Sequence, residues 1–169
     1  MEKILCITND FGPRAGGIET FVIGLIERLP RNTVIVYTSA QDNSQSYDQK
    51  WLEEYGVEVI RDKSKILLPT PGVSYCVKAI VRDRQIKTVF FGAAAPLGLL
   101  AGGLRRAGVK TIVALTHGHE VWWAKVWPFS WAIKYMSQRI DHLTYLGDYT
   151  KRAISQSVTA QAAAKMVKI

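Results

Sequence analysis

Residues 4–29, ILCITNDFGPRAGGIETFVIGLIERL, join a short apolar run to an amphipathic segment through a glycine pair. The first five residues are continuous, apolar and partly β-branched, which is typical of a parallel strand buried on both faces. Beyond the glycines, apolar residues recur at helical spacing, so one face of a helix is predicted to pack on a sheet. Gly16 and Gly17 allow a ligand to approach the backbone amides at the positive end of that helix. A tight βα turn without any ligand is the commoner use of such a pair.

The rest of the chain repeats this alternation of short β-rich runs and helical segments. The further strand candidates are residues 34–38, 57–61, 88–92, 111–115 and 141–145, with another strand beginning near Lys165. This rhythm predicts an α/β fold with a doubly wound, mostly parallel sheet covered by helices. Thr70 and Pro71 offer an N-cap and a first-turn proline for one helix, and the polar segment 41–49 is predicted to be a surface loop.

Composition limits the class of protein and its partners. The 169 residues fit one domain with a sizeable core, and 48% hydrophobic content indicates a globular chain. A net charge of +8 favours an anionic partner such as phospholipid, nucleotide or nucleic acid. No helix-turn-helix, RNP-like motif or basic tail supports nucleic acid. Cys6 and Cys76 lack metal or disulfide-framework spacing, and no signal peptide is visible, so we expect a reducing cytosol.

Residues 88–104 are the longest uncharged stretch, but glycines and Pro96 interrupt them. We therefore expect a buried strand, turn and helix there rather than a membrane span.

A second candidate loop, Thr116-His117-Gly118-His119-Glu120, follows the predicted strand 111–115. Open parallel sheets bind ligands at the carboxyl ends of their strands, so this loop is expected to share an edge with the glycine pair. The loop lacks the i, i+4 helical histidine pair of zincins, which makes a metal site the weaker reading. A histidine here can bond a substrate hydroxyl or act as acid or base. For this loop taken alone, an equally good interpretation is that the histidines only form hydrogen bonds with the loop backbone.

Aromatic and basic residues concentrate after this loop. Trp122, Trp123, Trp127, Phe129, Trp131 and Tyr135 are interspersed with Lys125 and Lys134. Such a mixture suits a lipid headgroup region, and we expect partial exposure of the rings rather than full burial in the core. A second basic cluster contains Lys78, Arg82, Arg84 and Lys87, with Arg105 and Arg106 farther along, although helix-surface cations are usually only solvated.

Three motifs in fixed order carry a family resemblance: residues 13–19 (PRAGGIE), 116–120 (THGHE) and 145–150 (YLGDYT). The whole chain resembles the N-terminal half of retaining family-4 glycosyltransferases of the GT-B architecture, particularly the actinobacterial phosphatidylinositol mannosyltransferases. The resemblance implies that residues 1–169 form the Rossmann-like, acceptor-side domain of such an enzyme. It also implies that the domain that binds the nucleotide-sugar is absent from this chain, so that the chain alone is inactive.

The resemblance implies roles for particular residues. His117 would be catalytic, beside the reacting sugar, and Gly16 and Gly17 would approach the donor phosphate or sugar. The acceptor or the membrane would be contacted by Arg14, Lys78, Arg82, Trp122, Trp123, Lys125 and Trp127. No metal and no cofactor are implied, because a nucleotide-sugar, GDP-mannose by family association, is a substrate.

The implied partners are this nucleotide-sugar, a phosphatidylinositol-like lipid acceptor, an anionic membrane surface and the protein's own C-terminal domain, but no nucleic acid. The implied location is cytoplasmic, peripheral at the inner face of the plasma membrane.

Two other functions remain open from the sequence. A non-catalytic peripheral membrane or phosphoinositide-binding module would share the basic and aromatic features. A Rossmann dehydrogenase is weaker, because the first turn lacks G-x-G-x-x-G and no acidic residue closes the second strand at Tyr37-Thr38-Ser39.

Overall fold

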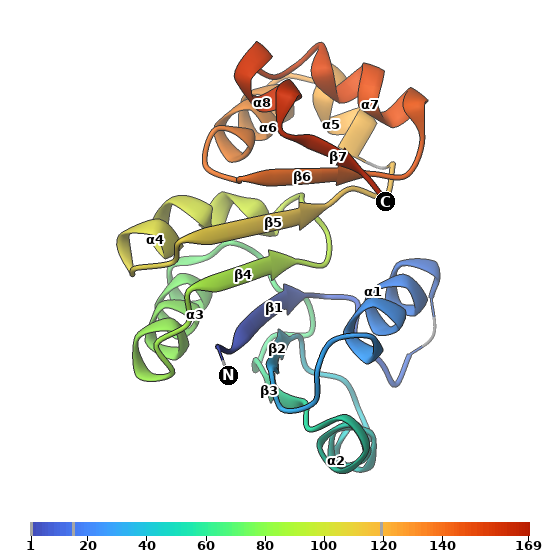
Figure 1. Cartoon of the computed structure of the whole chain (residues 1–169), viewed down its shortest axis with the longest axis vertical. Coiled ribbons are helices and arrows are strands. Elements are labelled where there is room, and N and C mark those ends of the chain that lie inside the picture. The colour runs from blue at the N-terminus through green and yellow to red at the C-terminus, as the bar shows by residue number, and fades with distance from the viewer. Residues whose placement is uncertain (1, 15, 119) are drawn as a thin grey trace.

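A computed structural model of the chain describes residues 2–14, 16–118 and 120–169, with the side chains of Trp123 and Ala124 left out of that description. Its centre is a parallel sheet of seven strands in the order β3-β2-β1-β4-β5-β6-β7 (Figure 1). The strands are β1 (Ile4–Thr8), β2 (Val34–Thr38), β3 (Glu58–Arg61), β4 (Thr88–Phe91), β5 (Thr111–Leu115), β6 (His142–Tyr145) and β7 (Met166–Lys168). The predicted doubly wound, Rossmann-like α/β fold is thus confirmed.

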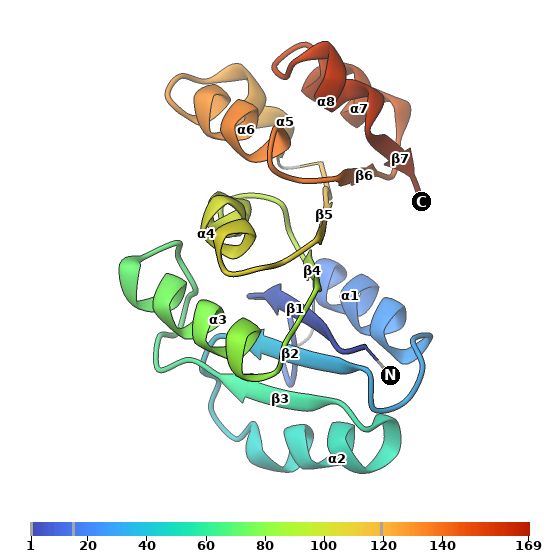
Figure 2. The same ribbon diagram turned by 60° about the vertical axis from the view of Figure 1, so that its left-hand side comes forward.

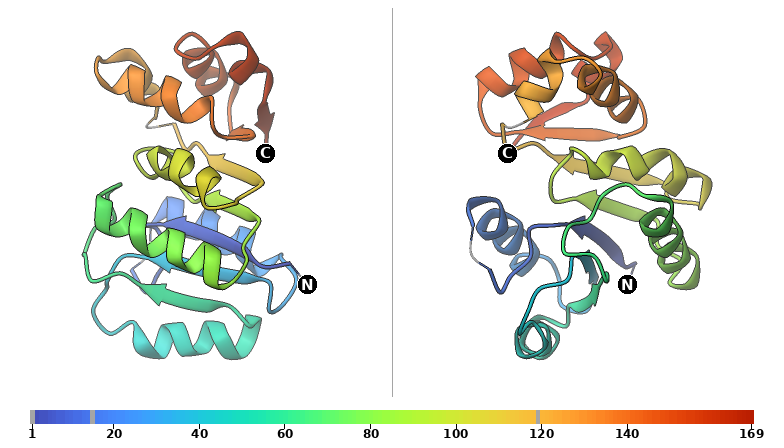
Figure 3. Two further views of the ribbon diagram at one scale, coloured as in Figure 1. Left: turned by 90° about the vertical axis from the view of Figure 1, so that its left-hand side faces the viewer. Right: turned by 180° about the vertical axis from the view of Figure 1, so that it is seen from behind.

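Helices cover both faces of this sheet (Figures 2 and 3). They are α1 (Gly17–Glu27), α2 (Gln45–Tyr55), α3 (Pro71–Asp83), a 3-10 turn η1 (Leu97–Leu100), α4 (Ala101–Arg106), α5 (Glu120–Lys125), α6 (Phe129–Ser137), α7 (Asp148–Ser155) and α8 (Ala160–Ala164). Alternate residues of the central strands face the two layers. Leu5 and Ile7 pack in the core beneath α3, α4 and α6, whereas Cys6 packs in the core beneath α1 and α2.

The sheet reverses its winding between β1 and β4. From β1 the chain proceeds outward through β2 to β3, and α3 then returns it to β4 on the other side of β1. Figure 1 shows that the arrows of β4, β5 and β6 all point toward the same edge. In an open parallel sheet this reversal leaves a crevice at the carboxyl ends of the two strands, where ligands characteristically bind.

Most elements lie where the sequence predicts them. All seven strand candidates form, with ends that match the prediction or differ from it by one residue. The Thr70 hydroxyl accepts the Val73 amide at 3.3 Å, which confirms the predicted N-cap of α3. The prediction of a loop over 41–49 is wrong from Gln45 onward, because α2 begins there. Trp51 is its buried residue and the rest of the helix is largely polar, so the sequence shows little helical periodicity.

The uncharged stretch 88–104 forms β4, η1 and the first residues of α4, as predicted. Within the described residues, no helix has the length and apolar character needed to cross a bilayer.

Phe11 anchors the β1–α1 loop to α2. Its side chain is fully buried, with ring centroids 5.7 Å from Tyr47 and 5.1 Å from Trp51. We expect Phe11→Ala to lower the free energy of unfolding by about 3–5 kcal/mol, because it leaves a cavity between these rings. Urea unfolding followed by circular dichroism measures the change.

Ile66→Ala is the matched control, because Ile66 is 66% exposed and its truncation is expected to cost less than about 0.5 kcal/mol. Equal midpoint shifts for the two variants would contradict the anchoring role of Phe11.

Candidate functional site

The glycine pair lies open at the start of α1. Gly16 is the N-cap residue in extended conformation, and a side chain built on Gly17 would meet nothing within 4 Å. Both residues are exposed. The loop before them is tightly packed, because a Cβ on Gly12 would lie 2.5 Å from the Tyr47 ring. The backbone at the glycine pair is therefore accessible, on a loop that is held from below.

A buried carboxylate already lies at this helix end. Glu19 in the first turn of α1 is 3% exposed, and one of its oxygens would lie 2.7 Å from a Cβ on Gly16. Burial raises the pKa of Glu19, Arg14 opposes that shift from 3.7 Å, and Asp10 adds to it. Because Glu19 counters the positive end of the helix, a ligand phosphate there gains less from the helix dipole than the sequence alone suggests.

The loop that carries His117 follows β5 and is held in place by buried hydrogen bonds. The Thr116 hydroxyl donates to the Thr144 carbonyl, and Gly118 has φ +101°, a conformation that favours glycine. Glu120 is fully buried at the start of α5. Its carboxylate accepts the His117 amide at 3.0 Å, so it fixes the backbone that carries the imidazole. His119 lies outside the described residues.

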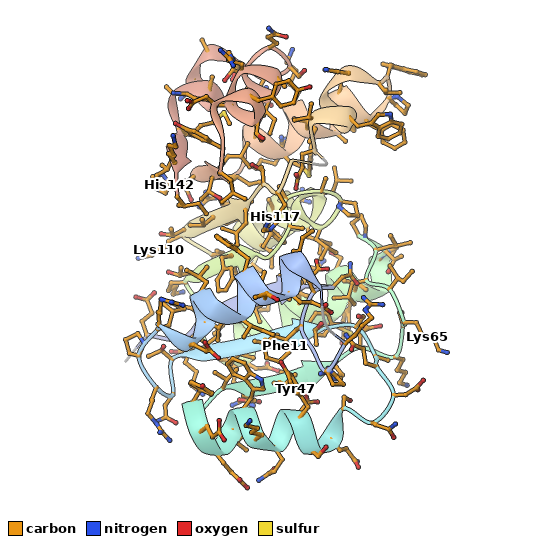
Figure 4. The ribbon with its side chains drawn as sticks, turned by 90° about the vertical axis from the view of Figure 1, so that its right-hand side faces the viewer. Phe11, Tyr47, Lys65, Lys110, His117 and His142 are labelled. Atoms are coloured by element: carbon orange, nitrogen blue, oxygen red, sulfur yellow. The ribbon has the colours of Figure 1, made fainter. Side chains whose placement is uncertain are left out.

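His117 lies over the crevice between β1 and β4. Its Nε2 is 2.6 Å from the carbonyl oxygen of Gly92, the residue that follows β4. Its ring also meets Phe21 of α1 edge to face, with centroids 5.5 Å apart. Figure 4 shows His117 above α1 on this side of the molecule. The His117 loop therefore contacts α1, the helix that begins at the glycine pair, through Phe21.

The Gly92 contact assigns the imidazole nitrogens. A carbonyl oxygen only accepts, so Nε2 must carry the proton that it donates to Gly92. In the neutral ring Nδ1 is then the nitrogen with a lone pair, able to accept a hydrogen bond or a proton. Gly92 itself must be glycine, because a Cβ there would lie 2.4 Å from the Thr8 hydroxyl at the end of β1.

The polar side chains described in this loop are directed at the backbone. The His117 Nε2 is directed at a backbone carbonyl, and the Glu120 carboxylate at a backbone amide. Within 2–14, 16–118 and 120–169, no group of three or more His, Cys, Asp or Glu side chains has the geometry to hold an ion.

Other predicted site residues lie away from the crevice. Arg14 is close to the glycine pair, with a side chain that is 72% exposed. Lys78 is half-buried and Arg82 is exposed, both on α3. Lys78 lines a hollow of about 250 Å³ between α3 and α4 together with Tyr135 of α6. Lys78 of α3 therefore lies beside Tyr135 of α6 rather than beside His117.

The predicted partial exposure of the aromatic region is confirmed for three tryptophans. Trp122, Trp127 and Trp131 are 56%, 82% and 62% exposed. Trp131 stacks on Tyr135 at 5.4 Å, which connects these rings to the hollow beside Lys78. Lys125 is exposed and its ammonium lies 5.8 Å from the centroid of the Tyr149 ring. The side chain of Trp123 lies outside the described part of the chain.

Several exposed apolar residues around the start of α3 are not predicted from the sequence. Ile66, Leu68 and Tyr75 are 66%, 50% and 71% exposed, around the start of α3. The signal was an apolar run in the segment KSKILLP, residues 63–69, which has neither strand nor helix period. Gly92 and Phe21 were also missed as partners of His117, because they come from separate segments and only the folded sheet brings them together.

The comparisons with known proteins agree with this architecture. The sequence profile described as Glycosyltransferase Family 4 matches residues 15–163. The chain belongs to glycosyltransferase family 4. It is 37% identical to a GDP-mannose-dependent monoacylated alpha-(1-6)-phosphatidylinositol monomannoside mannosyltransferase of Corynebacterium glutamicum, over 89% of this chain and 39% of that protein. It is 36% identical to the GDP-mannose-dependent alpha-(1-6)-phosphatidylinositol monomannoside mannosyltransferase of Mycolicibacterium smegmatis, over 95% of this chain and 42% of that protein. This family-4 chain thus spans about two fifths of the length of these relatives.

Solved structures show the same fold at low identity. Anabaena HepE in complex with UDP and glucose matches with a TM-score of 0.72 and 13% identity, over 100% of this chain and 44% of that chain. A UDP-N-acetylglucosamine 2-epimerase from Rickettsia bellii matches with a TM-score of 0.63 and 17% identity, over 99% of this chain and 44% of that chain. A transformation other than glycosyl transfer thus occurs on this fold, so the assignment to family 4 rests on sequence.

The Gly92 contact predicts a single neutral tautomer for His117. We expect a long-range proton–nitrogen correlation spectrum of the neutral ring, recorded in alkaline buffer, to show the proton on Nε2, because the Gly92 carbonyl holds it there. Exposed His142 on β6 is the internal reference, free to exchange between tautomers in water. A proton on Nδ1 of His117 would contradict the contact.

Proposed function

We propose that this chain is the acceptor-side domain of a nucleotide-sugar-dependent, retaining glycosyltransferase that transfers a hexose, mannose from GDP-mannose, to a phosphatidylinositol-derived lipid. Two relatives of this chain are named as GDP-mannose-dependent enzymes acting on a phosphatidylinositol monomannoside. The chain spans about two fifths of their length. In this proposal a C-terminal domain of the whole enzyme binds the nucleotide and completes the GT-B architecture. Residues 1–169 alone then turn over no substrate.

The placement of His117 at the winding reversal carries the proposal. The imidazole is held at the carboxyl ends of β4 and β5 by Gly92 and by Phe21 of the helix that begins at the glycine pair. Nδ1 of His117 accepts a hydrogen bond from a hydroxyl of the transferred sugar and orients it. The exposed backbone at Gly16 and Gly17 faces the sugar or the nearer phosphate of the leaving diphosphate.

This arrangement suits a transfer that depends on positioning. Retaining transfer passes through an oxocarbenium-like state as the nucleoside diphosphate leaves, and fixed donors around sugar and phosphate stabilise that charge separation. The carboxylates of the two loops, Glu19 and Glu120, are buried and directed at their own loops. They shape the site rather than attack the sugar.

The lipid acceptor requires a membrane-facing surface, and we assign it to a docking face of apolar and basic residues. This docking face comprises Ile66, Leu68, Tyr75, Lys78, Trp122, Lys125, Trp127, Trp131 and Lys134, with Arg82 at its margin. The hollow shared by Lys78 and Tyr135, and the stack of Trp131 on Tyr135, connect its two halves. Exposed rings beside ammonium groups match the interface of an anionic bilayer, here the inner face of the plasma membrane.

A non-catalytic membrane-binding module is the second candidate, favoured by the docking face alone. The coding sequence downstream of Ile169 separates the two candidates, because only the transferase requires a nucleotide-sugar domain there.

We expect His117→Ala in the intact enzyme to slow mannosyl transfer at least about tenfold, the usual contribution of an acid, base or positioning group. Transfer of labelled mannose from GDP-mannose to lipid measures the rate. Exposed His142→Ala is the matched control and should retain the normal rate. Normal turnover by the His117 variant would refute its role.

Anionic vesicles test the docking face. We expect the vesicles to shift the tryptophan emission of this chain to shorter wavelength, because Trp122, Trp127 and Trp131 are exposed when no membrane is present. The shift should weaken in the double variant Lys125→Gln/Lys134→Gln and at about 0.5 M salt, since screening weakens attraction between lysines and lipid phosphates. A shift that is absent, or insensitive to salt and to the two lysines, would remove the membrane assignment.

A further inference from the structure

A groove of about 550 Å³ lies at the carboxyl ends of β1, β2 and β3, next to the glycine pair but separate from the histidine crevice. Three loops line it: the β1–α1 loop, the β2–α2 loop and the β3–α3 loop. Its polar lining consists of Arg14, Ser39, Gln41, Asp42, Asn43 and Lys65. None of these residues except Arg14 stands out in the sequence, because they come from three separate segments.

The walls of this groove are fixed in advance by hydrogen bonds. The Gln41 side-chain amide donates to the Phe11 carbonyl at 2.9 Å and accepts the Arg14 amide at 3.1 Å. This clamp joins the first two loops. The Ala40 amide donates to the Ser64 carbonyl at 2.9 Å, which brings the loop that carries Lys65 alongside.

Arg61 strengthens the same frame from beneath. Its guanidinium is 12% exposed and makes two hydrogen bonds to Asp48, at 2.7 and 2.8 Å. It also donates to the Ser39 carbonyl at 3.1 Å and the Gly12 carbonyl at 2.6 Å. A guanidinium that is nearly buried and fully engaged is a fixed part of the scaffold, so the groove needs little rearrangement to accept a ligand.

The two cations of the groove are exposed and accessible to a ligand. Arg14 is 72% exposed, and its guanidinium forms an ion pair with Glu19 at 3.7 Å, longer than a hydrogen bond. Lys65 is exposed, and Figure 4 shows it reaching out at the edge of the molecule. Asp42 and Asn43 are exposed between them and offer acceptors and donors for hydroxyl groups.

We propose that this groove binds the phosphorylated polyol headgroup of the lipid acceptor, with the phosphodiester between Arg14 and Lys65 and ring hydroxyls on Asp42 and Asn43. The proposal rests on the proposed function and adds specificity-determining residues to it. Lys65 precedes the exposed Ile66 in the chain, so a headgroup in the groove leaves its acyl chains on the apolar part of the docking face. The polar end of the acceptor then lies beside the glycine pair.

A nucleotide fits this groove less well. Among the described residues that line the groove, none has an aromatic ring or a branched aliphatic side chain against which a base could stack. A polyol phosphate needs charge and hydrogen bonds instead, which the groove supplies.

Titration of this chain with glycerophosphoinositol, followed by amide chemical shifts, tests the groove directly. We expect saturable shifts at Arg14, residues 39–43 and Lys65. Inorganic phosphate, myo-inositol and GDP, titrated separately, should each bind at least about tenfold more weakly. Inorganic phosphate lacks the polyol, myo-inositol lacks the phosphate, and GDP carries a base that has no ring to stack on in the groove.

Single variants assign the cations. Arg14→Gln and Lys65→Gln should each weaken glycerophosphoinositol binding about tenfold, as expected for the loss of one charge-assisted contact. Lys110→Gln is the matched control, because Lys110 is exposed and lies on the opposite side of the molecule from Lys65 (Figure 4). The proposal is overturned by shifts confined to α3, by equal loss in the Lys110 variant, or by GDP or phosphate binding as tightly as the headgroup.

The intact enzyme separates this inference from the proposed function. Lys65→Gln should raise the KM for the lipid acceptor about tenfold and leave the KM for GDP-mannose unchanged. Mannosyl transfer with an unaltered acceptor KM would reject the groove and retain the transferase. Headgroup binding by a parent protein that transfers no sugar would reject the transferase and retain the groove.

Discussion

The close approach of β1 and β4 constrains everything at the site. Gly92 lies so near the Thr8 side chain that a Cβ would overlap the hydroxyl, and its amide donates to the Ile7 carbonyl at 3.0 Å. Only a bare backbone fits between the ends of these two strands, and that backbone presents the carbonyl to which His117 binds. The imidazole is therefore fixed by main-chain geometry of the sheet at its winding reversal, together with the buried Glu120 carboxylate and the Phe21 ring. A residue placed in this way keeps its orientation without help from a ligand.

The two loops of the site are each fastened by a buried carboxylate, but with different electrostatic consequences. Glu120 accepts a backbone amide of its own loop and so orients His117. Glu19 lies under the glycine pair, where burial raises its pKa, and it opposes the charge of Arg14 above it. Arg14 is the exposed cation beside the glycine pair, and its charge is partly offset by Glu19.

The sequence predicts the strands well because burial on both faces leaves continuous apolar runs, as in residues 34–38, which are all buried. It fails for α2, whose contribution to the core is Trp51 and whose polar surface resembles a loop. The shared edge of His117 and the glycine pair is also predictable, because strand ends in a parallel sheet fall on one side. The partners Gly92 and Phe21 are not, because their approach depends on the register and spacing of β1, β4 and β5. The groove is less predictable still, since Gln41 and Lys65 gain meaning only when three loops are clamped together.

One fold that serves both a sugar transferase and an epimerase must place its chemistry in details that topology does not specify. The parallel sheet supplies a crevice at the winding reversal, and any ligand of the right size can use it. In this chain, short loop segments join three surfaces: the glycine pair, the groove and the apolar part of the docking face. The loop that carries Phe11 also carries the glycine pair, and the loop that carries Lys65 continues into exposed Ile66 and Leu68. In the proposed complex, a lipid held by its headgroup between the loops directs its acyl chains toward the docking face. The hydrogen bonds of Gln41 and Arg61 fix how these loops lie relative to one another.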